Sequence, residues 1–409
     1  MQKESIPQNV LSRSLELPCG ILLKNRIAKS AMSDSLANGK GDPSDTQIRL
    51  YQRWAEGGLA LSIIGEVQID VGYPEKPGNL VVTETSNQQM LQALAQKGTA
   101  NHAHLWPQLG HAGALSHPPI SKPKGPSALD IEGFTCGGMT EDEVKALPDL
   151  FAVAAIRVKA AGFTGIQIHA AHGFLLSQFL SPLFNRRDDR YGGSIQARAS
   201  IVLEIIEKVR HAVGDKFPIA IKINSSDQLE GGLSECDALE FIRMLDQTSI
   251  DLIDISGGTY FPGAKASSDS AGSGPYFIDF ARRAKVVTSI PLMVTGGFKT
   301  QAQAIEAVTS GAVDVVGIAR AMVLDPNLPK AWLSTINETE LEASKNPVFP
   351  KFTLPPIGGI TAWYTMRLTA LGEDQENTFT LDLPEAVRMY DERDEKRCID
   401  WAKNFTVEH

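Results

Sequence analysis

Two histidines follow an apolar segment near the middle of the chain. His169 and His172 stand three residues apart in the run IHAAHG, where a strand would end and a loop begin. The pair could be ordinary core or loop histidines, ligands of a metal ion, or donors that face one ligand. A metal site needs a third ligand, and neither cysteine nor an acidic residue adjoins the pair. As donors, two imidazole N–H groups aimed at one carbonyl or nitro oxygen would draw electrons from a conjugated alkene.

Glycine and arginine end two later apolar segments. Gly296 and Gly297 end the run MVTGG, and Ala319 and Arg320 end the run GIAR. The last two strands of a parallel barrel commonly hold a phosphate with backbone N–H groups and a cation, and glycine lets the backbone approach the anion. A tight turn followed by a surface arginine is the alternative interpretation.

A lysine interrupts another apolar segment. Lys222 lies in the run AIKIN, which has the length of a buried strand. A lysine inside a barrel strand could be the Schiff-base nucleophile of an aldolase, a member of an ion pair, or a charge that faces a cofactor.

The segments that must position these residues alternate between strand length and helical period, which predicts parallel strands joined by helical crossovers. Eight strands predict a TIM barrel of the α/β class. The expected strands are Ile27–Met32, Leu59–Glu66, His104–Leu109, Gly165–His169, Ile219–Asn224, Leu252–Ser256, Leu292–Thr295 and Val313–Ile318. The expected helices are Thr46–Glu56, Asn87–Ala100, Glu141–Ala161, Ile195–Val213, Glu235–Thr248, Ile278–Thr288, Gln301–Ser310 and Asn327–Ile336.

Three further segments lie outside this alternation. Glu16–Leu23 predicts a short hairpin that closes the barrel bottom, and His111–Phe134 predicts a long loop that lines the site. Pro347–Pro356 predicts a linker into a mostly helical tail. We therefore expect a barrel over residues 1–336 and an extension over 337–409, which packs on its own barrel or on a neighbouring subunit. Its expected contact residues, with core packing as the alternative, are Trp363, Tyr364 and Arg367.

Composition restricts the partners. The net charge of −9 disfavours a nucleic-acid or anionic-membrane partner, because both require clustered lysine and arginine. The four cysteines are far apart, which predicts neither a disulfide framework nor a metal site. No segment has the length of a membrane-spanning helix, and the N-terminus lacks the pattern of a signal peptide. We expect a cytoplasmic protein that acts on a small molecule, and a homo-oligomer is compatible with the sequence.

The run from Ile168 to Ser194 closely resembles the Old Yellow Enzyme family of FMN-dependent ene reductases. That family's motif is His-x-x-His/Asn-Gly-Tyr-Leu, then Gln/Glu-Phe-Leu-x-Pro and Arg-x-Asp-x-Tyr-Gly-Gly. The resemblance extends over about Leu17–Trp332 and gives His169 and His172 the role of substrate donors. Phe174 occupies the position of the tyrosine that usually donates the proton.

The resemblance also implies where FMN is held. The first strand would place backbone against the isoalloxazine, with Ser33 tuning its potential, and the second would offer backbone contacts. Lys222 stands where the family has an arginine near flavin N1, and Ala319 replaces the glycine of a Gly-Arg pair. The implied cofactor residues are Ala31, Met32, Ser33, Glu66, Val67, Gln108, Lys222, Gly296, Gly297, Ala319 and Arg320.

The implied activity is reduction of activated alkenes, quinones or nitro compounds by NAD(P)H. No Gly-x-Gly-x-x-Gly sequence occurs, so NAD(P)H and the substrate would share one pocket in a ping-pong cycle of hydride transfer via flavin N5. The missing proton would come from Tyr260, from Tyr276 or from solvent, or alkene reduction would be slow. The alternatives are an NAD(P)H oxidase or quinone reductase, a flavin-binding protein with weak ene reduction, and a phosphate-binding Schiff-base barrel that uses Lys222.

Overall fold

Eight parallel strands form a closed barrel in the computed structural model, which describes residues 9–131, 134–261, 274–334, 346–353, 355–356 and 358–405. Each strand pairs with the next in chain order, and the last pairs with the first. The predicted TIM barrel is therefore confirmed. Its strands are β3 (Ile27–Lys29), β4 (Leu61–Gln68), β5 (His104–Gly110), β9 (Ile166–Ala170), β10 (Ile219–Asn224), β11 (Leu252–Ser256), β12 (Leu292–Thr295) and β13 (Val315–Ile318).

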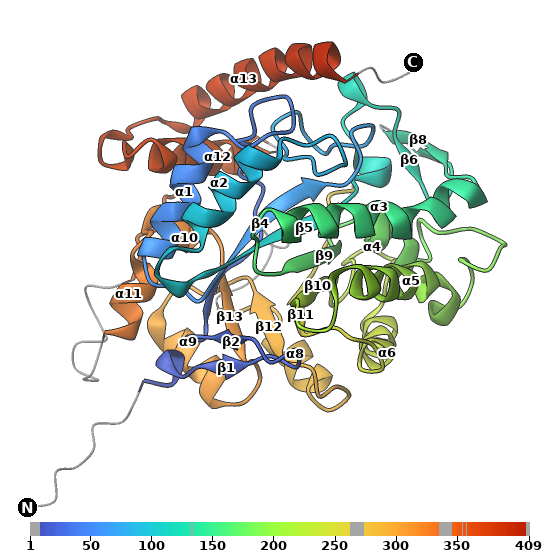
Figure 1. The fold of residues 1–409 in the computed structure, drawn as a ribbon, viewed down its shortest axis with the longest axis horizontal. Helices are drawn as coiled ribbons and strands as arrows, with labels where there is room; N and C mark the ends of the chain where they lie inside the picture. Colours follow the sequence, from blue (N-terminus) through green and yellow to red (C-terminus); the bar gives the residue numbers. More distant parts are fainter. Residues whose placement is uncertain are drawn as a thin grey trace, which may run out of the picture.

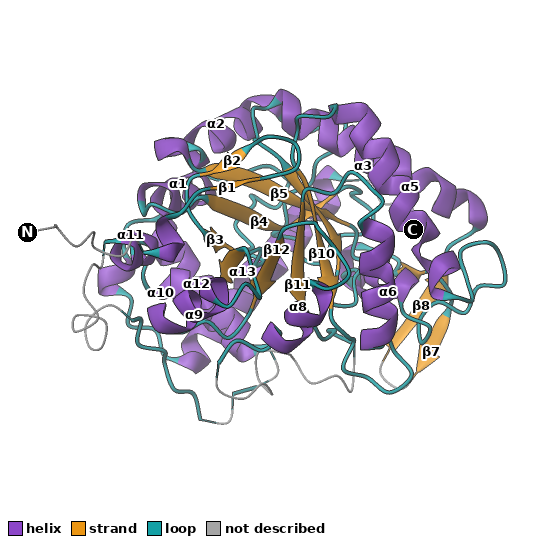
Figure 2. Ribbon diagram, turned by 90° about the horizontal axis from the view of Figure 1, so that it is seen from below, coloured by secondary structure: helices purple, strands orange, loops and turns teal. Residues whose placement is uncertain are grey.

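Helices surround the barrel, as Figure 2 shows. Side-chain caps fix several starts: Thr140 and Glu143 form a capping box, and Ser234 accepts from the backbone N–H of Asp237. All eight predicted helices are present: α1 (Asp45–Glu56), α2 (Gln88–Gly98), α3 (Glu141–Ala160), α5 (Ile195–Val213), α6 (Glu235–Leu245), α8 (Ile278–Ala284), α9 (Gln301–Thr309) and α11 (Leu328–Leu333). Two short helices were not predicted, α4 (Leu175–Leu180) and α10 (Arg320–Leu324), because five or six residues are too few to show a helical period.

The barrel interior is apolar at the amino ends of the strands. The predicted hairpin is present as β1 (Leu15–Glu16) and β2 (Leu22–Leu23), and it closes this end with Leu17 and Leu23. The interior side chains at this level are Ala28, Leu61, Ile63, Trp106, Ala220, Leu252, Met293 and Val315. Polar side chains occupy the next level toward the carboxyl ends, so the site begins directly above an apolar plug.

The segment after β5 is more ordered than predicted. Instead of a plain loop over His111–Phe134, it contains two 3₁₀ turns, η3 (Gly113–Leu115) and η4 (Pro118–Ile120), and a small sheet. The sheet has the order β6-β8-β7, with β6 (Lys124–Gly125), β7 (Leu129–Ile131) and β8 (Phe134–Gly138). The prediction was wrong in this respect because strands this short carry no alternating pattern.

The C-terminal tail consists of two helices, α12 (Gly359–Gly372) and α13 (Leu383–Asn404). In Figure 1, α13 lies at the top of the molecule and the hairpin β1–β2 lies at the bottom. Arg397 of α13 donates to the Ser35 carbonyl oxygen at 2.5 Å, and Trp401 packs with Val81 and Ile120. The described part of the tail thus contacts its own barrel, near the carboxyl ends of the first strands. The expected domain boundary at 336–337 lies outside the described residues.

Candidate active site

The histidine pair stands at the carboxyl end of β9. His169 belongs to the strand and is buried, whereas His172 follows in a loop with a φ of +62°, in the left-handed region. The neighbouring strands hold this loop: the His172 N–H donates to Asn224 Oδ1 at 3.0 Å, and His172 Nε2 lies 2.8 Å from Ser256 Oγ. The two rings meet edge to face, with their centroids 5.4 Å apart. The structure therefore brings the two predicted donors together.

Both imidazoles are held neutral. Burial lowers the pKa of His169 well below its usual value, and repulsion from a protonated His172 and from the positive charge of Lys222 would act in the same direction. Burial and Lys222 likewise lower the pKa of His172. His169 Nε2 is buried and has no hydrogen-bond partner among the described residues. A buried polar nitrogen without a partner is costly, so this nitrogen suits a ligand.

Two aromatic rings adjoin the pair. Phe174 is buried with its centroid 5.0 Å from that of His169. Tyr260 is 61% exposed, and its ring lies 5.9 Å from His172 and 5.8 Å from Phe174. The Tyr260 N–H donates to the His172 carbonyl oxygen at 3.1 Å, which ties this residue to the histidine loop. The other candidate, Tyr276, lies against Gly296 instead, and its N–H donates to the Gly296 carbonyl oxygen at 3.4 Å.

Lys222 and Gln108 lie inside the barrel below the histidines. Lys222 is in register with His169 across the β9–β10 pair, so both side chains point inward. Its Nζ lies 3.3 Å from Asp254 Oδ2, and both groups are almost fully buried. Gln108 donates through Nε2 to Gln167 Oε1 at 2.7 Å. These four side chains come from four strands and form one polar layer.

The ends of the first two barrel strands lie against each other. Ala31, Met32 and Ser33 follow β3 and are partly exposed. A Cβ at Gly65 of β4 would lie 2.3 Å from the Met32 carbonyl carbon, so only glycine permits this approach. Sequence reasoning missed Gly65, although a glycine inside an apolar strand is a signal of close backbone contact.

Glu66 and Val67 follow Gly65 at a bulge in β4. Glu66 has a φ of +59°, and Val67 is fully buried. Burial raises the pKa of the Glu66 carboxyl well above its usual value, and nearby Glu75 adds to the effect. The Glu66 N–H points to Gln108 Oε1 across a long 3.5 Å contact, which connects the bulge to the polar layer.

The glycines and arginine predicted to hold a phosphate lie on adjacent strands. β12 and β13 pair with Thr295 opposite Gly317, so the turns that follow are neighbours. Gly296 has a φ of +119° and Gly297 a φ of +84°, which exclude most other residues. Ala319 precedes α10, and the Arg320 guanidinium lies 5.8 Å from the centroid of the Tyr364 ring. Burial raises the pKa of Tyr364 to about 12, which keeps this ring a neutral partner for the cation.

The polar side chains of the site that were not predicted include Gln167, Asn224, Asp254 and Ser256. A period of two would have indicated them. Gln167 and His169, Lys222 and Asn224, and Asp254 and Ser256 each alternate with isoleucine along their strands, and alternate residues share a face. The interior of this barrel can thus be read from the polar members of otherwise apolar strands.

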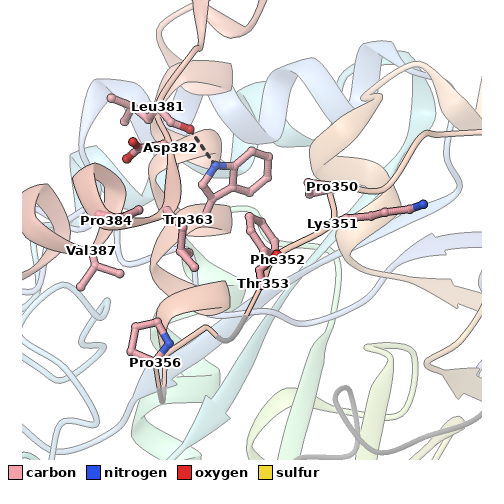
Figure 3. A pocket seen from close by; sticks show the side chains of 11 residues that line it. Pro350, Lys351, Phe352, Thr353, Pro356, Trp363, Leu381, Asp382, Pro384 and Val387 are labelled. Carbon is pink, nitrogen blue, oxygen red and sulfur yellow. Dashed lines mark hydrogen bonds between the residues drawn. The ribbon is translucent and has the colours of Figure 1, made fainter.

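A separate cavity of about 590 Å³ lies in the tail, between residues 350–353 and Pro356 on one side and helices α12 and α13 on the other (Figure 3). Trp363 stands in its wall and donates from its indole nitrogen to the Leu381 carbonyl oxygen at 3.0 Å. None of the residues predicted to bind cofactor or substrate lines it. We therefore place the chemistry at the barrel and not in this cavity.

The described ranges contain no group of three or more His, Cys, Asp or Glu side chains that could hold a metal ion. The same ranges contain no helix long and apolar enough to cross a membrane.

A closed eight-stranded barrel with its polar groups at the carboxyl ends of the strands is the architecture of an α/β-barrel enzyme. A family model for the NADH:flavin oxidoreductase / NADH oxidase family matches residues 19–338. The chain belongs to this family, which includes the Old Yellow Enzyme relatives. The family resemblance inferred from the histidine motif is confirmed.

The relatives support the same assignment. The NADH-dependent flavin oxidoreductase iliE of Hypocrea jecorina is 33% identical over 405 residues, which cover 90% of this chain and 98% of that protein. The NADPH dehydrogenase of Bacillus licheniformis is 30% identical over 79% of this chain and 94% of its own. Other relatives are longer: the chain spans 48% of the NADH oxidase of Thermoanaerobacter brockii, at 30% identity.

Solved structures show the same fold. Morphinone reductase superposes with a TM-score of 0.71 at 22% identity, over 85% of this chain and 93% of that one. A 2-naphthoyl-CoA reductase superposes with a TM-score of 0.74 at 27% identity, over 78% of this chain and 51% of that one.

The protein is thus an NADH- or NADPH-dependent flavin oxidoreductase whose cofactor is FMN. The site fits this cofactor in two respects. Gly65 lets the backbone at Met32 lie close to β4, and two positive-φ glycines follow the strand that pairs with the one before Arg320. Membership in this family decides against the Schiff-base alternative for Lys222.

Proposed function

We propose that this oxidoreductase reduces alkenes activated by a carbonyl or nitro group, with quinones and nitro compounds as further acceptors. The observation that carries the proposal is that His169 and His172 are both neutral and that the buried Nε2 of His169 has no hydrogen-bond partner among the described residues. Two neutral imidazoles can each donate one N–H to the same substrate oxygen without adding a net charge. A Schiff-base or hydrolytic site would need neither feature.

FMN, when bound, supplies the two-electron chemistry between NAD(P)H and the acceptor. We propose that FMN is held by the backbone of Ala31, Met32, Ser33, Glu66 and Val67, by Gln108 and Lys222, and by Gly296, Gly297, Ala319 and Arg320. The Lys222 charge would face the reduced cofactor, and Arg320 with the glycine amides would face the phosphate.

The histidines act on the substrate oxygen. As hydride reaches the β-carbon of the alkene, negative charge develops on the oxygen, and donors fixed in a buried site stabilise it without rearranging. Asn224 and Ser256 keep the His172 loop in place through the contacts at 3.0 and 2.8 Å. The buried ring of Phe174 excludes water from the side of His169.

The α-carbon requires a proton, and Phe174 has none to give. We assign the proton to the Tyr260 hydroxyl, because its ring adjoins both Phe174 and His172. Tyr276 is not favoured, since it lies against Gly296 at the end of β12. A general acid contributes on the order of 10²- to 10⁴-fold, so Tyr260 would set the rate of alkene reduction without being required for oxidation of NAD(P)H.

The buried Phe174 also favours a second candidate, an NAD(P)H oxidase or quinone reductase with weak ene reduction. Quinones and dioxygen accept electrons without needing a proton delivered to a carbon atom. Four separated free cysteines fit a reducing compartment such as the cytoplasm, and we propose that location.

The visible spectrum of the purified holoprotein tests the function. Flavin bands that bleach with NADH or NADPH in the absence of oxygen, and return when 2-cyclohexenone is added, are the expected result. Bands that bleach and return only with a quinone or dioxygen would favour the second candidate. A colourless protein that FMN cannot reconstitute would overturn both.

Variants at the aromatic positions test the proton donor. Tyr260→Phe should slow reoxidation by 2-cyclohexenone about 10²-fold, at the lower end of general-acid effects, and leave bleaching by NADH unchanged. Tyr276→Phe is the matched control and should leave both rates unchanged. Phe174→Tyr restores a hydroxyl beside His169 and should rescue the Tyr260→Phe variant. An unchanged enone rate in Tyr260→Phe would assign the proton to solvent.

A further inference from the structure

A continuous set of hydrogen bonds crosses the interior of the barrel, and Asp254 is its centre. This carboxylate is fully buried on β11. Oδ1 accepts from Thr295 Oγ1 at 2.6 Å, and Oδ2 accepts from Gln167 Nε2 at 3.2 Å and lies 3.3 Å from Lys222 Nζ. Three donors from three neighbouring strands therefore converge on one side chain. Nothing in the motifs of the sequence assigns it a role.

The set extends in both directions around the barrel. On one side, Gln167 Oε1 accepts from Gln108 Nε2 at 2.7 Å, and Gln108 Oε1 faces the Glu66 N–H at 3.5 Å. On the other side, Thr295 Oγ1 lies 2.8 Å from Oγ of Ser30, which directly follows β3. The hydrogen bonds thus reach the first strand's end in one direction and the β4 bulge in the other.

Asp254 determines which atom donates and which accepts in each of these hydrogen bonds. A carboxylate only accepts hydrogen bonds, so Gln167 must turn its NH₂ group toward Asp254 and its carbonyl oxygen toward Gln108. Gln108 must then turn its NH₂ group toward Gln167, which leaves its carbonyl oxygen on the side of Glu66. An amide side chain can otherwise exchange its two ends. The orientation of the Gln108 amide is therefore determined by Asp254, which lies two hydrogen bonds away through Gln167.

Asp254 also determines the charge of the layer. Lys222 is 1% exposed, and its cation has the Asp254 carboxylate as a counter-ion at 3.3 Å. The pair as a whole is neutral, whereas Lys222 alone would add a full positive charge to a buried site. Two residues that we assign to the cofactor, Gln108 and Lys222, thus depend on the same carboxylate.

We propose that Asp254 is a positioning residue that acts on FMN binding in two ways. It orients Gln108 through Gln167, which strengthens the binding of both redox forms, and it offsets the charge of Lys222, which sets the relative affinity of the protein for oxidised and reduced FMN. The proposal rests on the proposed placement of FMN beside these two side chains, but not on the identity of the acceptor.

Asp254→Asn tests the proposal. The substitution leaves the Lys222 charge without its counter-ion and permits Gln167 to reverse, so reduced FMN, which carries the extra negative charge, should bind better relative to oxidised FMN. The expected change in the ratio of the two dissociation constants is about tenfold, from one buried unit charge near the cofactor. For a two-electron couple this raises the midpoint potential by about 30 mV.

Asp251→Asn is the matched control. Asp251 is also buried and directly precedes β11. It pairs with Arg210 at 2.7 Å and accepts from the Ile219 N–H at 2.8 Å, but it lies at the opposite end of the barrel. Loss of this ion pair should destabilise the fold without moving the potential. If the midpoint potential shifted equally in both variants, Asp254 would act only on the stability of the fold. An unchanged potential in Asp254→Asn would overturn the proposal.

Gln167→Met provides a second test if Asp254→Asn does not fold. It removes the connection to Gln108 but keeps the Lys222–Asp254 pair. FMN titration of the apoprotein should show about tenfold weaker binding of both redox forms, the order expected for one lost buried hydrogen bond, with the potential unchanged. Unchanged FMN affinity would overturn the proposal. Both measurements use no alkene, so they do not depend on whether the protein is an ene reductase.

Discussion

Two of the regions that bury charged side chains, the barrel interior around Lys222 and the inner face of α13, differ in how those side chains are paired. In the barrel, Lys222 and Asp254 lie 3.3 Å apart and share hydrogen bonds with residues of the adjoining strands. On the face of α13 that lies against the barrel, Asp394 is 8% exposed, and neither of its carboxylate oxygens has a hydrogen-bond partner among the described residues. Arg393 likewise has two buried nitrogens without such a partner there.

This difference indicates different tasks. A polar network with every member paired holds one geometry, as a cofactor floor requires. A helix face with unpaired charges is held less firmly, because each unpaired group adds a desolvation cost. We infer that the barrel layer is fixed in advance of ligand binding and that α13 opens at lower free energy than the barrel.

The largest expected effect comes from breaking the paired region. Lys222→Met would leave the Asp254 carboxylate buried without its counter-ion, and it should lower the free energy of unfolding by about 3–5 kcal/mol. Arg397→Met on α13 removes the hydrogen bond to Ser35 and should cost about 1 kcal/mol. Urea denaturation of the apoproteins measures both. Equal losses would contradict the distinction between the two regions.

Opposite responses to pH are expected from buried histidine and buried aspartate. Burial lowers the pKa of His169 and His172, so the folded protein binds fewer protons than the unfolded chain below about pH 6.5. Stability from this pair is therefore present above that pH and is lost as the pH falls. In urea denaturation between pH 8 and 4, the free energy of unfolding should fall less steeply for the double variant His169→Asn, His172→Asn than for the native protein. A profile parallel to that of the native protein would contradict the assignment.

Asp394 should respond in the other direction. Burial raises its pKa, although Arg393, Lys76, Arg397 and the Tyr390 hydroxyl lie near enough to offset part of the effect. The folded protein thus binds more protons than the unfolded chain just above about pH 3.9, and stability falls as the pH rises through this window. Asp394→Asn should gain stability relative to the native protein between pH 4 and 7. A loss at pH 7 would show that the carboxylate has a strong partner.

The smallest effect is expected where charges are exposed. Asp374, which is about half exposed, pairs with Arg49 and Arg53 of α1 and joins the tail to the barrel surface. Asp374→Ala should cost less than about 1 kcal/mol, because water and salt screen such pairs. The difference from the native protein should shrink further in 0.5 M salt. A salt-independent loss of several kcal/mol would place this pair with the buried ones.

The barrel and the histidine pair could be predicted from the sequence because both depend on local patterns. Apolar runs of strand length recur eight times, and His169 and His172 belong to one short motif. The role of Asp254 could not be predicted, since it depends on which strands become neighbours once the barrel closes. Tyr260 was one of two candidate hydroxyls, and its contacts with His172 and Phe174 in the folded structure separate it from Tyr276. The small sheet after β5 was missed because its strands are too short to show a period.

In the proposed function, His169 and His172 polarise the oxygen of an activated alkene. The direct test of this role compares two reoxidation rates of the NADH-reduced protein, with 2-cyclohexenone and with dioxygen, in the native protein and in His169→Ala. Loss of one donor to a developing oxyanion should slow the enone reaction about 10²- to 10³-fold, whereas the dioxygen reaction, which needs no such donor, should change far less. Equal slowing of both reactions, or an unchanged enone rate, would contradict the account.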